Sequence, residues 1–360
     1  MRGTGGHAAA GDGPTTSDPA IGAADVPPAP PHAVPDGPAT PHVWLEDLLG
    51  PDFQQRTMPL ADDEEGEVVA TLVRHHPPER EGLRPARAVL YVHGWSDYFF
   101  QTHLAEHWTA LGAAFYALDL RKYGRSLRDH QSPGYITDLA TYDEDIEAAL
   151  AVIAGELGTA ASVLLMAHST GGLVAALWTD RNPGRVTGLV LNSPWLELQG
   201  SATARYLTMP AVDSLARLNP LLELPNVDPG FYARSLRELE VAADINPSWR
   251  PVPAFPVRPG WLRAVTAGHA HVARGLHIDV PILVMASARS AFAPRWNQTM
   301  LASDIVLDVE AIVRRAVRLG PIVTIARFDG GLHDLVISPE PVRKHVFLEI
   351  TRWCAVYGWG

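Results

Sequence analysis

The chain has 360 residues, which is more than one average domain but fits a single α/β domain that carries an insertion. Hydrophobic residues make up 47% of it and charged residues 19%, which excludes a wholly disordered or fibrous protein and provides for a sizeable core. The formal net charge of −11 repels phosphate backbones and anionic lipid head groups, so nucleic acid is not expected as a partner.

Residues 1–41 are rich in proline and glycine and contain no aromatic residue. Such a stretch cannot bury enough apolar surface to offset its ordering entropy, so we predict a disordered tail. The tail lacks the continuous apolar run of a secretory signal. Elsewhere the sequence has no uninterrupted run of about 18 apolar residues, so we predict no membrane-spanning helix. The single cysteine, Cys354, cannot form an internal disulfide and is expected to fill space in a C-terminal helix; a cytoplasmic location is expected.

From Val43 onward, short apolar runs alternate with segments of helical periodicity. This alternation predicts an α/β fold with a mostly parallel sheet flanked by helices. A helix is predicted over 138–157, because its apolar residues share one face, acidic residues lie near its start and Gly158 follows its end. Strands are predicted at 68–73, 88–92, 114–118, 163–166, 186–191, 282–285 and 322–328.

The alternation is interrupted in residues 195–275, here called the insertion. The insertion contains nine prolines and three tryptophans, with helical fragments such as 235–243 but no comparable strand pattern. We therefore expect an inserted, largely helical cap between two parts of the α/β core, residues 42–194 and 276–360.

A candidate nucleophile follows the predicted strand 163–166. Residues 163–174 form an apolar strand, then the turn His168-Ser169-Thr170-Gly171-Gly172, then a helical run. A serine on such a strand-turn-helix projects its hydroxyl from the sheet, next to helix N–H groups that can hold an anion. Alanine stands in the first place of the usual Gly-x-Ser-x-Gly pattern and is still small. We interpret Ser169 as a catalytic serine; the alternative is a purely structural turn.

A second turn follows the strand 88–92, where His93 and Gly94 lead into Trp95. Gly94 permits a backbone bend that aims the next N–H inward, as in an oxyanion hole. The backbone N–H groups of Trp95 and Thr170 are therefore predicted to stabilise a tetrahedral intermediate. His93 itself is expected to be structural.

These motifs resemble the α/β-hydrolase superfamily, in particular its branch of monoacylglycerol lipases and S33 serine aminopeptidases. The resemblance spans roughly residues 60–355 and includes the His93-Gly94 turn, residues 116–126, the turn around Ser169 and residues 330–334. Lys122 replaces a glycine of the family's middle motif, a change expected to affect only a structural loop. The resemblance implies an α/β-hydrolase fold with a cap.

The resemblance also places a catalytic histidine at His333, after the strand 322–328 and a Gly-Gly turn. Imidazole can accept the serine proton near neutral pH and return it to the leaving group. The histidine pairs His75-His76 and His269/His271 lack the Cys, Asp or Glu spacing of a metal site. Neither a metal nor any other cofactor is expected.

The third member of the triad is less clear from the sequence. The family's acid follows the penultimate strand, yet the residues directly after 282–285 include no carboxylate. Asp304 lies in a family-like Ser-Asp-x-Val setting before a predicted helix, whereas Asp308 suits the N-cap of that helix. Asp304 is the preferred candidate and Asp308 the alternative; both keep the order serine, acid, histidine.

Together these residues predict acyl transfer to water by a serine hydrolase. The insertion's aromatic residues favour a carboxylic ester with an apolar acyl group, as in lipases, esterases or lysophospholipases, although they could equally form the cap's own core. The alternatives are an S33-type aminopeptidase or amidase, and a non-catalytic protein that binds a small ligand. The aromatic residues are Trp195, Tyr206, Phe231, Tyr232, Trp249, Phe255 and Trp261.

Overall fold

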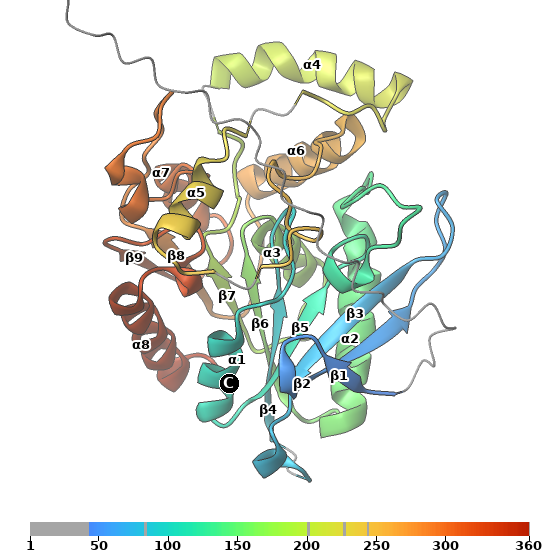
Figure 1. Cartoon of the computed structure of the whole chain (residues 1–360), viewed down its shortest axis with the longest axis vertical. Coiled ribbons are helices and arrows are strands. Elements are labelled where there is room, and N and C mark those ends of the chain that lie inside the picture. The colour runs from blue at the N-terminus through green and yellow to red at the C-terminus, as the bar shows by residue number, and fades with distance from the viewer. Residues whose placement is uncertain (1–42, 83–84, 200–201, 226–227, 243–244, 360) are drawn as a thin grey trace, which may run out of the picture. The chain divides into compact units, whose positions relative to one another are not determined.

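The computed structural model describes residues 43–359 except 83–84, 200–201, 226–227 and 243–244, and only the backbone of 202–209 (Figure 1). The predicted tail, residues 1–41, lies outside the described residues. Within the described part of the chain, no helix is both long enough and apolar enough to cross a bilayer.

The described residues form one nine-stranded sheet in the order β1-β2-β3-β5-β4-β6-β7-β8-β9. The pairings of β1 with β2, β2 with β3 and β3 with β5 are antiparallel, and the remaining pairings are parallel, which confirms the predicted mostly parallel sheet. The strands are β1 (Leu45–Asp47), β2 (Gly50–Pro59), β3 (Val69–His75), β4 (Arg87–Val92), β5 (Ala114–Asp119), β6 (Ser162–His168), β7 (Gly188–Asn192), β8 (Ile282–Ser287) and β9 (Val323–Phe328).

All seven predicted strands are present, with shifted ends. The first two strands of the sheet, β1 and β2, were not among the predictions. Strand β2 has a proline near each end and polar residues in its middle, so its sequence lacks the apolar pattern of a strand. It is held instead by seven paired positions along β3.

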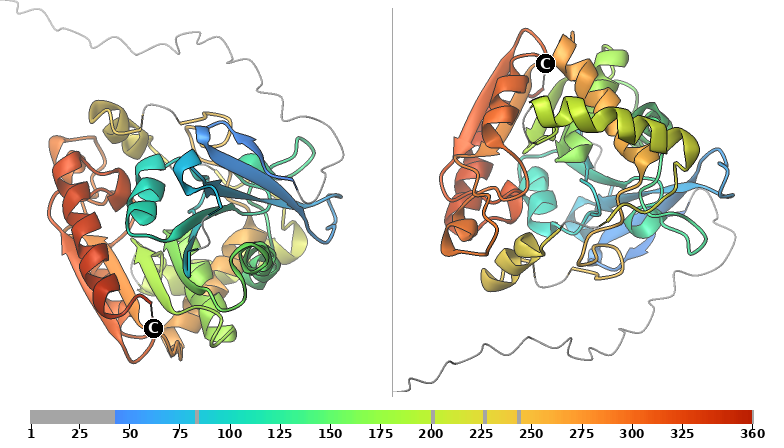
Figure 2. Two further views of the ribbon diagram at one scale, coloured as in Figure 1. Left: turned by 90° about the horizontal axis from the view of Figure 1, so that it is seen from below. Right: turned by 90° about the horizontal axis from the view of Figure 1, so that it is seen from above.

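Helices cover both faces of the sheet (Figures 1 and 2). Because strand side chains alternate between faces, Tyr91 of β4 packs with α1 (Thr102–Ala110) and α8 (Glu340–Val356), whereas Leu90 packs with the helices on the other face. Those helices are α2 (Tyr142–Leu157), α3 (Thr170–Arg181) and α7 (Val309–Ala316). Cys354 is buried in α8, as predicted.

The predicted helix 138–157 is confirmed as α2 with a short 3₁₀ turn, Leu139–Thr141, before it. The Asp138 side chain caps that turn by accepting a hydrogen bond from the Ala140 N–H at 2.9 Å. The α-helix therefore begins at Tyr142, and it ends at Gly158, whose φ of +89° suits a glycine.

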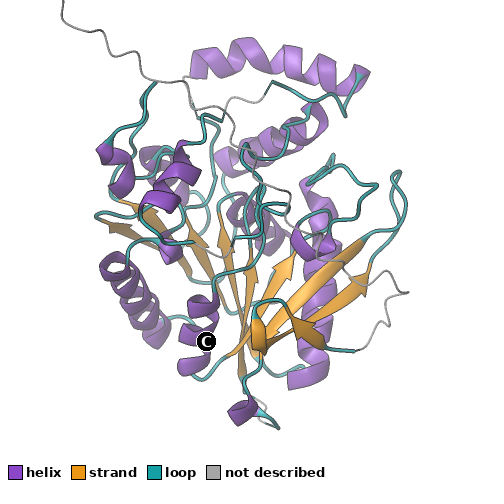
Figure 3. Cartoon of the chain, in the orientation of Figure 1, coloured by secondary structure: helices purple, strands orange, loops and turns teal. Residues whose placement is uncertain are grey.

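The insertion contains α4 (Ala202–Leu218), α5 (Phe231–Glu238) and α6 (Pro259–Arg274), and no strand among its described residues (Figure 3). The helix predicted near 235–243 begins four residues earlier than expected, after Gly230, whose φ is +71°. Helix α6 packs closely on α3: a Cβ at Gly268 would lie 3.0 Å from the Leu177 Cδ1 atom.

Lys122, the departure from the family's glycine, has a φ of +62°, which explains why glycine suits this position. Its side chain is buried, and its Nζ atom lies 2.6 Å from an Asp63 oxygen and 2.5 Å from a Glu65 oxygen. Although burial acts to raise the pKa values of the two carboxyls, the Lys122 ammonium lowers them below their usual range. These ion pairs, which join the loop after β5 to the loop between β2 and β3, compensate for burying the lysine.

Candidate active site

Ser169 occupies the sharp turn between β6 and α3, with a φ of +52° and a ψ of −118°. Two close approaches require the small residues around it. A Cβ on Gly94 would lie 3.0 Å from the Ser169 Cβ atom, and a Cβ on Gly171 would lie 2.1 Å from the His93 carbonyl oxygen. The predicted strand-turn-helix is therefore present, and its backbone lies directly against the turn after β4.

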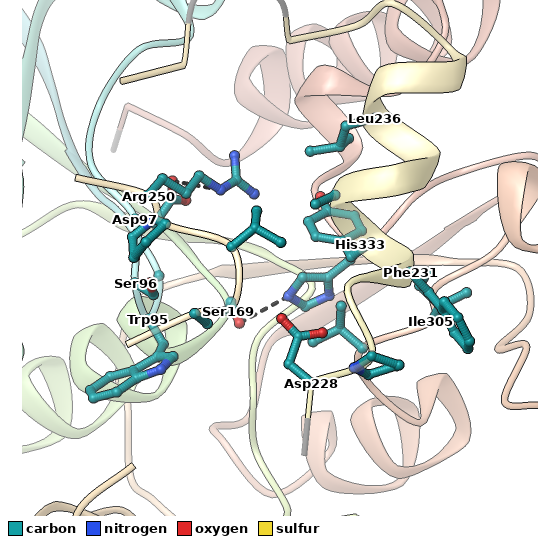
Figure 4. A pocket seen from close by; sticks show the side chains of 18 of the residues that line it. Trp95, Ser96, Asp97, Ser169, Asp228, Phe231, Leu236, Arg250, Ile305 and His333 are labelled. Carbon is teal, nitrogen blue, oxygen red and sulfur yellow. Dashed lines mark hydrogen bonds and ion pairs between the residues drawn. The ribbon is translucent and has the colours of Figure 1, made fainter. Parts of the chain in front are cut away.

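The three side chains predicted as nucleophile, base and acid lie in one hydrogen-bonded chain. The Ser169 Oγ atom lies 3.0 Å from His333 Nε2, and His333 Nδ1 lies 2.9 Å from an Asp304 carboxylate oxygen (Figure 4 draws the first contact). All three side chains are buried. Because an ionised carboxylate only accepts, Nδ1 is the protonated nitrogen and Nε2 accepts from the serine hydroxyl.

Asp304 and Asp308, the two candidates for the acid, have different surroundings. The other oxygen of Asp304 accepts hydrogen bonds from the backbone N–H groups of Val306 and Leu307, both at 2.8 Å. Asp308 instead caps α7, and its carboxylate accepts from the Glu310 N–H at 3.0 Å. The structure thus places Asp304 against His333 and leaves Asp308 as a helix cap.

His93 is structural, as predicted. Its Nδ1 atom donates to the Gly94 carbonyl oxygen at 2.7 Å, and its Nε2 atom accepts from the Leu120 N–H at 3.1 Å. Burial lowers its pKa, which keeps the ring neutral. By contrast, the backbone N–H groups of Trp95 and Thr170 have no hydrogen-bond acceptor among the described residues. They lie on either side of the Ser169 turn, one residue after Gly94 and at the first position of α3.

A buried polar network behind His333 was not predicted from the sequence. The Asp334 carboxylate is fully buried and accepts hydrogen bonds from Asn192 at 2.7 Å and Gln101 at 3.1 Å. Burial acts to raise the pKa of Asp334, but the nearby His168 ring and these two hydrogen bonds outweigh it and lower the pKa. Asn192 is the last residue of β7, and Asp334 directly follows His333 in the loop after β9. These positions at the ends of strands were a signal in the sequence from which the network could have been predicted.

A cavity of about 950 Å³ opens above Ser169 and His333, and its walls are largely apolar (Figure 4). The loop after β4 forms one side and α5 the opposite side. Of the insertion's aromatic residues, Phe231, Tyr232 and Phe255 line the cavity. Trp195 and Trp261 pack with each other outside its lining, so some of the insertion's aromatic residues line the cavity and others belong to its packed interior. The side chain of Tyr206 is not among those described.

Charged residues interrupt the largely apolar wall; they include Asp228 and Arg237, and an ion pair between Asp97 and Arg250. Arg250, from the insertion, faces Asp97 with its Nε atom 3.5 Å from an Asp97 oxygen (Figure 4). Burial raises the pKa of Asp97, and Arg250 partly opposes that effect. No sequence signal identified Arg250, because its role depends on how the insertion folds onto the core.

Within the part of the chain that the structure describes, no three or more His, Cys, Asp or Glu side chains are grouped as metal ligands. The His75 ring contacts Thr109 Oγ1 at 2.8 Å, and the His269 ring contacts the Trp195 carbonyl oxygen at 2.9 Å. These histidines thus lie in separate local hydrogen-bond networks.

Two curated proteins are similar in sequence. A monoacylglycerol lipase of Mycolicibacterium smegmatis is 25% identical over 273 residues, which cover 75% of this chain and 88% of the relative. Phospholipase YtpA of Bacillus subtilis is 31% identical over 210 residues, which cover 56% of this chain and 75% of the relative.

Solved structures share the fold. The monoacylglycerol lipase of Paleococcus ferrophilus matches with a TM-score of 0.55 at 21% identity, over 74% of this chain and 92% of that one. A carboxyl esterase of Bacillus coagulans matches with a TM-score of 0.61 at 14% identity, over 84% of this chain and 98% of that one. At these identities the likeness shows the fold alone, which is the α/β-hydrolase fold.

A family model described as serine aminopeptidase, S33, matches residues 84–340. The match covers more than half of the chain and includes the turns after β4 and β6, the insertion and the loop with His333. The chain therefore belongs to the S33 serine aminopeptidase family of α/β-hydrolases.

Proposed function

We propose that this protein is a serine hydrolase that cleaves carboxylic esters with an apolar acyl group through an acyl-enzyme intermediate. The observation that supports this most directly is the chain of hydrogen bonds from Ser169 through His333 to Asp304 at the floor of a largely apolar cavity. A monoacylglycerol lipase and a phospholipase among the relatives agree with ester hydrolysis.

In the first half of the proposed reaction, the Ser169 Oγ atom bonds to the ester carbonyl carbon while its proton moves to His333 Nε2. The N–H groups of Trp95 and Thr170 hold the oxyanion of the tetrahedral intermediate. His333 then gives its proton to the alcohol oxygen as the carbon–oxygen bond breaks. Asp304 holds the imidazole in the required tautomer and stabilises its charged form.

In the second half, water enters in place of the alcohol. His333 accepts a proton from that water, the water oxygen attacks the acyl carbon, and a second tetrahedral intermediate collapses to release the acid and restore the Ser169 hydroxyl. No metal or other cofactor takes part in either step.

The composition of the cavity wall supports an apolar acyl group. Burying a methylene group against such a wall contributes about 0.8 kcal/mol, so each added methylene strengthens binding until the cavity is full. The residues of the wall include Trp95, Leu224, Phe231, Leu236, Phe255, Leu262, Phe292, Met300 and Ile305. An ester of a medium or long acyl chain suits this site better than a peptide with a charged amino terminus.

Nitrophenyl esters of increasing acyl length, assayed beside aminoacyl anilides, test the proposal. We expect kcat/KM to rise with acyl length and to exceed that of the anilides. Ser169→Ala should lower ester turnover by about 10³-fold or more, because the members of a triad act as a unit. Ser214→Ala, at an exposed position of α4, is the matched control and should retain turnover.

Two other functions give different results in this experiment. An aminopeptidase or amidase would turn over the anilides faster than the esters. A non-catalytic ligand-binding protein would turn over neither and would not be labelled at Ser169 by a fluorophosphonate probe. Ester turnover that persists in folded Ser169→Ala contradicts the proposed nucleophile.

A further inference from the structure

The loop that follows β4, Trp95–Tyr98, is held by the insertion rather than by the core alone. We call it the β4 loop. Each of its four side chains contacts a residue of segment 246–261 of the insertion. The ion pair between Asp97 and Arg250 in the cavity wall is one of these contacts.

Two of the contacts are hydrogen bonds from insertion backbone to loop side chains. The Phe255 N–H donates to Ser96 Oγ at 3.1 Å, and the Asn246 N–H donates to the Tyr98 hydroxyl at 2.7 Å. Ser96 is 4% exposed and Tyr98 is fully buried, so water does not compete freely for either bond. Because both donors are backbone groups, the bonds depend on the path of the insertion's main chain.

Aromatic rings at the two ends of the β4 loop add further contacts. The Trp95 ring lies 3.8 Å from the Trp261 ring, centroid to centroid, and the Tyr98 ring meets the Trp249 ring edge-on at 5.1 Å. Trp261 is buried and belongs to α6, which is packed on α3. The insertion therefore contacts the β4 loop at both of its ends as well as at Ser96.

The backbone of the β4 loop needs such support. Ser96 has a φ of +51°, a conformation that is unfavourable for residues other than glycine and persists where the surroundings hold it in place. Its neighbour Trp95 supplies one of the two proposed oxyanion N–H groups. A change in the Ser96 conformation would turn the peptide that joins Trp95 to Ser96, and the resulting shift of the Trp95 backbone would move the Trp95 N–H away from the oxyanion.

We propose that Ser96 is a positioning residue through which the insertion holds the Trp95 N–H in the geometry of the oxyanion hole. This inference rests on the proposed serine mechanism. The insertion then does more than cover the substrate, because a displacement of segment 246–255 removes an oxyanion donor. Ser96 itself touches neither the acyl carbon nor the oxyanion in this scheme.

The test compares two variants. Ser96→Ala removes the hydroxyl that accepts from the Phe255 N–H, and Ser96→Gly removes the same hydroxyl and also the strain of the positive φ. Both variants should lower kcat by about 10-fold or more while KM stays within about 2-fold, since misplacing an oxyanion donor weakens only the transition state. Ser248→Ala, an exposed position on the same segment, is the matched control and should leave kcat and KM unchanged.

Fluorophosphonate labelling gives a second readout that needs no particular acyl group. Ser169 Oγ bonds to phosphorus, fluoride leaves, His333 accepts the serine proton, and the phosphoryl oxygen uses the same two N–H groups. The labelling rate of both Ser96 variants should fall by about 10-fold or more. If the wild type is labelled but turns over no ester, the proposed ester function fails, and the labelling rates still decide the role of Ser96.

Tyr98→Phe is an independent variant, because it removes the acceptor of the Asn246 N–H and keeps the ring against Trp249. It should lower kcat and the labelling rate in the same direction, and it decides the question where a Ser96 variant does not fold. Wild-type kcat and labelling rates in a folded Ser96→Ala or Ser96→Gly protein would overturn the proposal. A rise in KM at constant kcat would also overturn it, because it would assign Ser96 to substrate binding.

Discussion

Asp304 and Asp308 are separated by one helical turn of sequence, yet only Asp304 reaches the imidazole of His333. One oxygen of Asp304 is committed to two backbone N–H groups, and the other faces His333 Nδ1. This arrangement makes the effect of an amide at position 304 predictable, because only an oxygen can accept the two backbone hydrogen bonds.

We predict that Asp304→Asn lowers kcat by up to about 10⁴-fold while leaving the melting temperature near that of the wild type. The amide oxygen of the variant would accept from the backbone, so its NH₂ group would face Nδ1. The His333 proton would then move to Nε2, which could no longer accept the Ser169 proton.

Asp308→Asn is the matched control for this prediction. Asparagine caps helices about as well as aspartate, so the variant should change kcat and the melting temperature little. Steady-state kinetics and thermal denaturation of the two variants provide the check. A large loss of kcat in Asp308→Asn, with Asp304→Asn near wild type, would assign the acid to Asp308.

At the scale of secondary-structure elements, two glycines in neighbouring helices have opposite surroundings. Gly171 lies in the first turn of α3, where a Cβ would come within 2.1 Å of the His93 carbonyl oxygen and 2.9 Å of the Val92 carbonyl oxygen. Gly155 lies near the end of α2, is exposed, and has no heavy atom within 4 Å of the same position. The first glycine permits close packing of α3 on β4, whereas the second only weakens its helix.

We predict that Gly171→Ala lowers the free energy of unfolding by about 1–3 kcal/mol or more, because backbone atoms cannot yield to the new methyl group. It should also reduce activity by displacing the Ser169 turn. Gly155→Ala should raise the free energy of unfolding by about 0.5–1 kcal/mol. Urea denaturation of both variants measures these changes, and a tolerated Gly171→Ala would contradict the close approach of α3 and β4.

At the scale of the whole molecule, histidines that are buried or half-buried make the free energy of unfolding depend on pH. His107 is a half-buried residue of α1, and its ring stacks on Phe347 of α8 at a centroid distance of 4.4 Å. Burial lowers the pKa of His107 from 6.5 to about 4. Below pH 6.5 the unfolded chain therefore gains a proton that the folded protein does not, so stability is lost as the pH falls from about 6.5 to about 4.

We predict that His107→Phe keeps the ring contact with Phe347 and removes this pH dependence at one site. The free energy of unfolding of the variant should fall less steeply between pH 6.5 and pH 4 than that of the wild type. Other histidines with lowered pKa values act in the same direction, so some acid sensitivity should remain; they include the buried His93 and His168 and the half-buried His75 and His103. Curves for variant and wild type that run parallel over this range, measured by urea denaturation, would refute the assignment.

The sequence by itself determined the features that arise from short stretches of chain. A strand, a tight turn and a helix around Ser169 are specified within 12 residues, and the turns at Gly94 and before His333 are equally local. The mostly parallel sheet followed from alternating apolar runs, because a strand buried on both faces needs a continuous apolar segment. The chemistry of these turns could therefore be predicted before any contact between them was known.

Only the tertiary structure decided the features that depend on contacts between distant segments. Both Asp304 and Asp308 suit a loop before a helix, and only the folding of that loop against the one after β9 separates them. The hydrogen bond between Ser96 and Phe255 joins residues 159 positions apart, and no local pattern records it. Strands β1 and β2 are likewise held by pairing rather than by an apolar pattern, since backbone hydrogen bonds can order a polar segment once β3 offers an edge.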